Sequence, residues 1–75
     1  MNDKELIQKE IARIGKSRLV KSYAALGKSE NTLKTALVRG SVSKGLAFDL
    51  ETLTQVSALF WMWPNVYQTN GEKRI

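Results

Sequence analysis

Glycines at positions 15, 27 and 40 divide the first half of the chain into short segments, so any helix there must be short. Within each segment the apolar residues recur every three or four positions, which is the period of an amphipathic helix. In the first segment Ile7, Ile11 and Ile14 form one stripe, and Asn2 is a favourable N-cap. The pattern therefore predicts a helix over residues 2–14.

The same period predicts further helices over residues 17–26, 29–39 and 44–55. The segment 57–67 is different, because its apolar run at 58–63 has no clear period and Pro64 interrupts whatever precedes it. A short helix and a short strand both fit this segment. We expect a mostly all-α domain of four to five helices over residues 1–67, followed by a flexible tail over 68–75.

The composition argues against most catalytic and metal chemistry. The 75 residues include no Cys and no His, which excludes disulfides, the usual zinc sites and the common nucleophile–base pairs of enzymes. We therefore expect a protein that is not an enzyme and that uses no metal and no cofactor. The N-terminus is polar, and the apolar run at 58–63 is far shorter than a membrane span. These features predict a cytoplasmic protein with no membrane partner.

Positive charge is concentrated in one part of the chain. The whole chain has a net charge of +5, but residues 16–44 carry seven basic side chains against one acidic side chain, Glu30, which leaves this segment at +6. A concentrated basic region is typical of proteins that bind polyanions. A solvated lysine surface without any partner explains the same charge equally well, so other features must decide.

Residues 23–37, YAALGKSENTLKTAL, have the pattern of a helix-turn-helix, in which one short helix braces a second. Gly27 allows the turn, and Leu26 and Leu33 are expected to pack into the core. The second helix has only a narrow apolar stripe, made by Leu33, Ala36 and Leu37. Most of its surface is therefore polar, and in a helix-turn-helix protein such a surface enters the major groove of DNA.

Several short motifs occur in a recognisable order: LG–x–S at 26–29, Arg–Gly–x–Val at 39–42, DLETLT at 49–54 and Trp–Pro–Asn at 63–65. Together they resemble the Cro family of phage helix-turn-helix repressors and its YdaS-like and CI-type relatives. The resemblance covers roughly residues 19–67 and implies a lambda-repressor-like helix-turn-helix domain. Tyr23 departs from the family pattern, because this position usually holds a small alanine where the two helices approach closely.

The resemblance implies a transcriptional repressor, in bacterial cytoplasm or a phage host cell, that binds operator double-stranded DNA as a homodimer. Asn pairs well with adenine, and Lys donates to guanine. Simpler roles remain open, with Ser29 as a helix cap and Lys34 and Arg39 as solvated charges. By position, the side chains that would face bases are Glu30, Asn31, Lys34 and Thr35. Those that would contact phosphates are Lys16, Arg18, Lys28, Ser29, Thr32, Arg39, Ser41 and Lys44.

The aromatic segment near the C-terminus holds more large apolar side chains than a small helical core needs. We expect part of it to complete the core and part to form an exposed patch, where aromatic residues act as interface anchors. An alternative function uses the same patch differently, in a protein-binding regulator such as an antirepressor or an antitoxin-like protein with another phage or host regulator as partner. The expected homodimer contacts are Leu59, Trp61, Trp63, Val66 and Tyr67.

Overall fold

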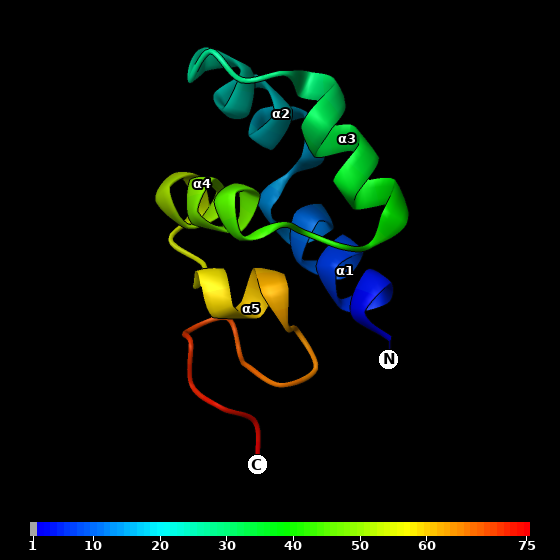
Figure 1. Ribbon diagram of the computed structural model, residues 1–75, viewed down its shortest axis with the longest axis vertical. Helices are drawn as coiled ribbons and strands as arrows, with labels where there is room; N and C mark the ends of the chain where they lie inside the picture. Colours follow the sequence, from blue (N-terminus) through cyan, green and yellow to red (C-terminus); the bar gives the residue numbers. More distant parts are fainter. Residues whose placement is uncertain (1) are drawn as a thin grey trace.

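The computed structural model describes residues 2–75, and within this range the chain forms five helices and no strand, which confirms the predicted all-α class. Figure 1 shows α1 and α3 side by side, α2 across the top, and α4 and α5 on the other side of the molecule. The segment 57–67, for which helix and strand were both open, begins as a short helix. The helices are α1 (Asp3–Ile14), α2 (Lys16–Ala25), α3 (Glu30–Arg39), α4 (Lys44–Thr54) and α5 (Ala58–Met62).

The helix boundaries follow from local capping. The Asn2 side chain accepts a hydrogen bond from the Glu5 amide at 2.8 Å, and the Ser43 hydroxyl accepts one from the Leu46 amide at 3.3 Å. These bonds satisfy amides that have no acceptor inside a helix. At the other end of α3, Gly40 has a φ of 69° and its amide bonds to the Ala36 carbonyl.

Side chains from all five helices form one core. Trp61 and Phe60 of α5 pack edge to face, with ring centroids 5.3 Å apart. Trp61 is fully buried, so the expectation that it contacts a second copy of the chain is wrong. A buried ring stabilises the monomer by removing apolar surface from water. The core comprises Ile7, Ile11, Leu19, Tyr23, Leu33, Leu37, Val42, Leu46, Ala47, Leu50, Val56, Ala58, Phe60 and Trp61.

The end of α3 lies directly against the start of α1. A Cβ atom placed on Gly40 would come within 2.7 Å of the Lys4 Cα atom, which is backbone and cannot swing away. The Gln8 side chain on α1 also donates a hydrogen bond to the Leu37 carbonyl on α3 at 3.4 Å, which gives the two helices a second point of contact. Glycine at position 40 therefore allows α1 and α3 to lie in close contact, and any larger residue there would push the two helices apart.

The chain after α5 folds back as a hairpin. Tyr67 and Lys73 form an isolated antiparallel bridge, and the Arg74 amide donates to the Val66 carbonyl at 2.7 Å. The hairpin is joined to the rest of the domain where the Ser57 amide donates to the Thr69 carbonyl at 2.9 Å. Residues 68–74, which the sequence analysis assigned to a tail outside the domain, are thus hydrogen-bonded to it, at the lower end of the molecule in Figure 1.

Candidate nucleic-acid interface

The turn between α2 and α3 is built around Gly27. The amides of Leu26 and Gly27 bond to the carbonyls of Tyr23 and Ala24 at 3.1 and 2.9 Å, which closes the end of α2. Gly27 has a φ of 78°, a conformation that favours glycine, and it redirects the chain into α3. Leu26 is 47% exposed, so the prediction that it packs into the core is wrong.

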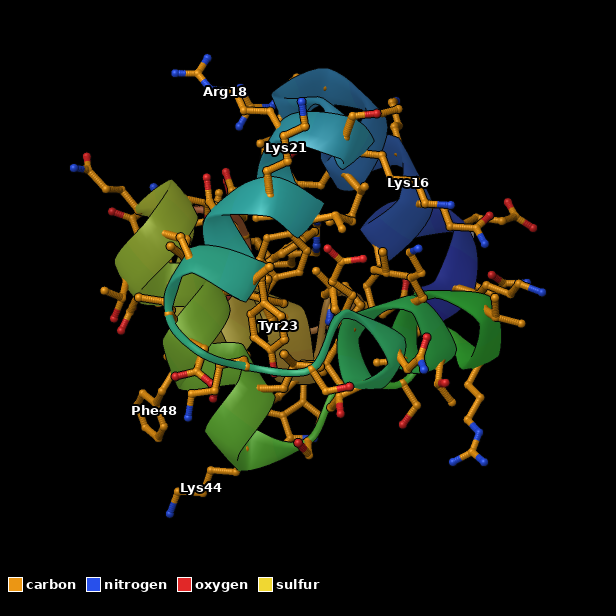
Figure 2. The ribbon with its side chains drawn as sticks, turned by 90° about the horizontal axis from the view of Figure 1, so that it is seen from above. Lys16, Arg18, Lys21, Tyr23, Lys44 and Phe48 are labelled. Carbon is orange, nitrogen blue, oxygen red and sulfur yellow. The ribbon has the colours of Figure 1, made fainter. Side chains whose placement is uncertain are left out.

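Tyr23 supplies the buried side chain at this end of α2 in place of Leu26. Its ring lies behind the turn in Figure 2 and is almost fully buried. Burial raises the pKa of the Tyr23 hydroxyl above its ordinary value, and the negative charge of Asp49 on α4 raises it further. Asp49 also lies 3.9 Å from the Lys28 ammonium group. The turn is therefore joined to α4 by a charged contact as well as by packing.

The two faces of α3 differ sharply. Leu33 and Leu37 are buried in the core, and they fix the helix on the domain. Asn31, Thr35 and Val38 lie at spacings of three to four residues on the opposite face, where each is exposed. The helix thus presents one continuous outer surface along its whole length, as the narrow apolar stripe predicted.

Glu30 and Lys34 lie on one flank of this surface and contact each other. Their charged groups are 3.7 Å apart, one helical turn from each other, and both side chains are about half exposed. Such a surface pair contributes about 0.5 kcal/mol at most. Of the four side chains predicted to face bases, Asn31 and Thr35 are therefore on the outer face, while Glu30 and Lys34 form an ion pair at its edge.

A shallow groove of about 520 Å³ runs between α3 and the start of α4. Some of its lining residues are predicted to contact bases and others to contact phosphates, and the most distant of these, Asn31 and Ser41, are ten residues apart in sequence. Ala36 is partly buried and Leu46 is buried, whereas the other side chains that line the groove are polar and exposed. The lining residues are Asn31, Thr32, Thr35, Ala36, Arg39, Ser41, Ser43 and Leu46.

The remaining predicted phosphate contacts are divided between different faces. Lys16 lines a smaller groove of about 260 Å³ on the other flank of α3, next to Leu37 and Val38. Lys44 extends from the start of α4, whereas Arg18 extends from the opposite side of the molecule beside Lys21 (Figure 2). The structure therefore does not bring Arg18 together with the groove beside α3.

The helices differ in whether a side chain caps the N-terminus, and the sequence did not predict this difference. Side chains cap α1, α4 and α5, but α2 begins after Gly15, and the Ser29 side chain makes no capping hydrogen bond to α3. The expectation that Ser29 caps α3 through its hydroxyl is therefore wrong. In the part of the chain that the structure describes, no side chain caps the first turns of α2 and α3. Amides at such a terminus attract anions, because they add to the positive end of the helix dipole.

Around the end of α5, an aromatic patch lies at the surface. Trp63 and Tyr67 are neighbours, with ring centroids 6.1 Å apart, and Trp63 is 49% exposed. Val66, which lies between these two residues in the sequence, is exposed as well, whereas Leu59 and Tyr67 are partly buried. Four of the five residues expected at a dimer interface therefore have some exposed surface, and Trp61 has none.

Sequence reasoning missed one residue on the outer face of α3. Val38 is 68% exposed, and its position in the helical period, seven residues after Asn31, was a signal that it shares the face of Asn31. Elsewhere in residues 2–75, no group of three or more acidic, His or Cys side chains is placed to hold a metal ion. No helix in this range is long and apolar enough to cross a bilayer.

Comparison with known proteins adds no relative: no family model, no curated protein and no solved structure matches the chain. Evidence for a function of this chain therefore comes from the geometry of α3 and from the charge around it.

Proposed function

We propose that the protein is a sequence-specific double-stranded DNA-binding transcriptional regulator that binds operator DNA as a homodimer. The main support for the proposal is the division of α3 into two faces. The helix follows a glycine turn, buries Leu33 and Leu37 in the core, and exposes Asn31 and Thr35 on the opposite face. A major groove admits one helix and offers its base edges to such side chains.

The surroundings of α3 suit the two phosphate backbones that border a major groove. Arg39 and Ser41 line the groove on one flank of α3, and Lys16 lies on its other flank. The uncapped first turns of α2 and α3 offer amides to phosphate oxygens in addition. Cations on both flanks of one polar helix, together with uncapped amides at the starts of α2 and α3, favour a duplex over a small anion.

The position of the aromatic patch favours a homodimer. The molecule is 37 Å long, α3 lies in its upper half, and the hairpin that follows Trp63 lies at its lower end (Figure 1). A two-fold axis through the patch would separate two copies of α3 by a distance on the order of the molecule's own length. Successive major grooves on one side of a duplex are about 34 Å apart. A dimer joined at Trp63 and Val66 therefore fits two half-sites.

The test begins with selection of bound sequences from a random duplex library, followed by fluorescence anisotropy on the selected duplex. Lys44→Ala should weaken binding to all duplexes alike and lower the slope of log affinity against log salt by about 1. Lys21→Ala is the matched control, since it removes the same charge from the opposite side (Figure 2). Equal effects of the two variants would contradict the proposed face, and absence of any selected sequence would contradict the proposed function.

A second measurement separates base reading from simple charge. Asn31→Ala should relax the preference for one base pair and cost about 1–3 kcal/mol on the selected duplex, with little change on an unrelated duplex. Gln68→Ala, in the distant hairpin, is the control for the loss of an exposed amide side chain. If Asn31→Ala and Lys34→Ala both leave the affinity for the selected duplex unchanged, α3 does not read bases.

The exposed part of the aromatic patch also favours a second candidate, a protein-binding regulator that uses Trp63 and Val66 to hold another regulator. This candidate predicts a stable complex with such a partner and no duplex binding by the purified chain. The homodimer predicts that Trp63→Ala shifts the mass measured by light scattering from dimer to monomer. These two measurements distinguish the candidates.

A further inference from the structure

Val38 is the large apolar side chain on the outer face of α3, and the fold makes little use of it. It is 68% exposed, and only its inner side borders the small groove with Ile11 and Leu37. A β-branched residue at an exposed helix position is also slightly unfavourable for the helix itself. Its neighbours on the outer surface, Thr35 and Lys34, are polar, so the valine interrupts a surface otherwise suited to hydrogen bonding.

The major groove offers such a side chain one apolar partner. Base edges there carry donors and acceptors, and the exception is the C5-methyl group of thymine. Asn31 precedes Val38 by seven residues, or about 10.5 Å along the helix axis at 1.5 Å per residue. Base pairs along a duplex are about 3.4 Å apart. A helix lying along the groove would therefore place the two side chains about three base pairs apart.

We infer that Val38 reads a thymine C5-methyl group about three base pairs from the adenine that Asn31 reads. The inference rests on the proposed function and adds a specificity-determining residue to it. Each half-site then has two fixed features, an adenine recognised through hydrogen bonds and a thymine recognised through apolar contact.

The experiment replaces each thymine of the selected duplex, one at a time, by deoxyuridine, which lacks only the methyl group. Anisotropy should show about a fourfold loss of affinity at one position, which corresponds to burial of one methyl-sized group. The Val38→Ala variant should bind the thymine duplex with a similar loss, and its affinity should not change further when that thymine is replaced. Val38→Thr, which keeps the branched shape, should show an intermediate sensitivity.

Two controls keep the result interpretable. Ile75→Ala removes an exposed apolar side chain at the C-terminal end of the molecule, far from α3 (Figure 1), so it should retain the full ratio between thymine and deoxyuridine duplexes. The thermal midpoint of Val38→Ala should remain within about 4 °C of the wild type, because the side chain is largely exposed. Specific binding that is insensitive to every thymine methyl, or equal sensitivity in the Val38→Ala variant, overturns this inference alone. The lack of any specific duplex binding overturns the proposed function together with it.

Discussion

Replacement of Gly40 by alanine is expected to be the most damaging single methyl addition at the glycines of the helical region. The residue has a φ of 69°, and a side chain in this conformation costs about 1–2 kcal/mol. The added Cβ would also come within 2.7 Å of the Lys4 Cα atom, and overpacking of this kind costs about 1–3 kcal/mol more. The expected loss is therefore about 2–5 kcal/mol, a large part of the stability of a domain this small.

Two other glycines provide matched controls. Gly27 has a φ of 78° but open space around its Cβ position, so Gly27→Ala should cost only the conformational part, about 1–2 kcal/mol. Gly45 lies inside α4 with open space around it, and Gly45→Ala should stabilise the protein by up to about 1 kcal/mol. All three changes alter the unfolded chain in the same way, so their differences report the folded state.

Urea unfolding followed by tryptophan fluorescence measures these differences, with the denaturant midpoint as the readout and the slope as a check on two-state behaviour. About 1 kcal/mol corresponds to a shift of roughly 4–8 °C in a parallel thermal experiment for a domain of this size. If Gly40→Ala is no more destabilised than Gly27→Ala, the start of α1 and the end of α3 do not approach each other as closely as described.

Three further predictions follow from burial and charge. Burial raises the pKa of the Tyr23 hydroxyl in the folded protein above its unfolded pKa of about 10. The neutral hydroxyl therefore stabilises the fold below about pH 10, and this stability is lost as the pH rises through the folded pKa. Thermal melts between pH 9 and about 11 should show this loss in the wild type and not in Tyr23→Phe. At a protein concentration at which the chain is monomeric, Trp61→Ala should cost about 3–5 kcal/mol in urea unfolding, whereas Trp63→Ala, which removes a half-exposed ring, should cost about 1–2 kcal/mol; equal losses would refute the assigned burial. Glu30→Gln should raise the affinity for every duplex about equally in low-salt anisotropy, because it releases Lys34 from its ion pair and removes a negative charge beside the groove. A loss of affinity would instead show that Glu30 contacts a base.

The fold class and most helix boundaries could be predicted because they depend on local patterns. Glycines end α1 and α3, and apolar side chains recur at helical spacing in the first four helices. The conformation around Trp61 could not be predicted in this way, since a run of apolar residues has the same pattern in a buried helix and in a strand. Its burial against Phe60 depends on contacts with distant parts of the chain.

The candidate site could be predicted only in part for a similar reason. The helical period correctly placed Asn31 and Thr35 on the outer face, but periodicity does not report which charges will pair, as Glu30 and Lys34 do. It also gave no warning that Leu26 would be exposed or that the Ser29 hydroxyl would leave the α3 amides uncapped. These outcomes depend on side-chain size and rotamer in the assembled domain.

The separation between the buried and exposed faces of α3 has a consequence for evolution. Leu33 and Leu37 hold the helix in place, so substitutions at Asn31, Thr35 and Val38 should change stability by about 0.5 kcal/mol or less. Under the proposed function, a lineage of such proteins can therefore acquire a new recognition sequence by substitutions at three positions without passing through unfolded intermediates. The same property makes this helix a suitable place for a combinatorial library, in which nearly every member should fold.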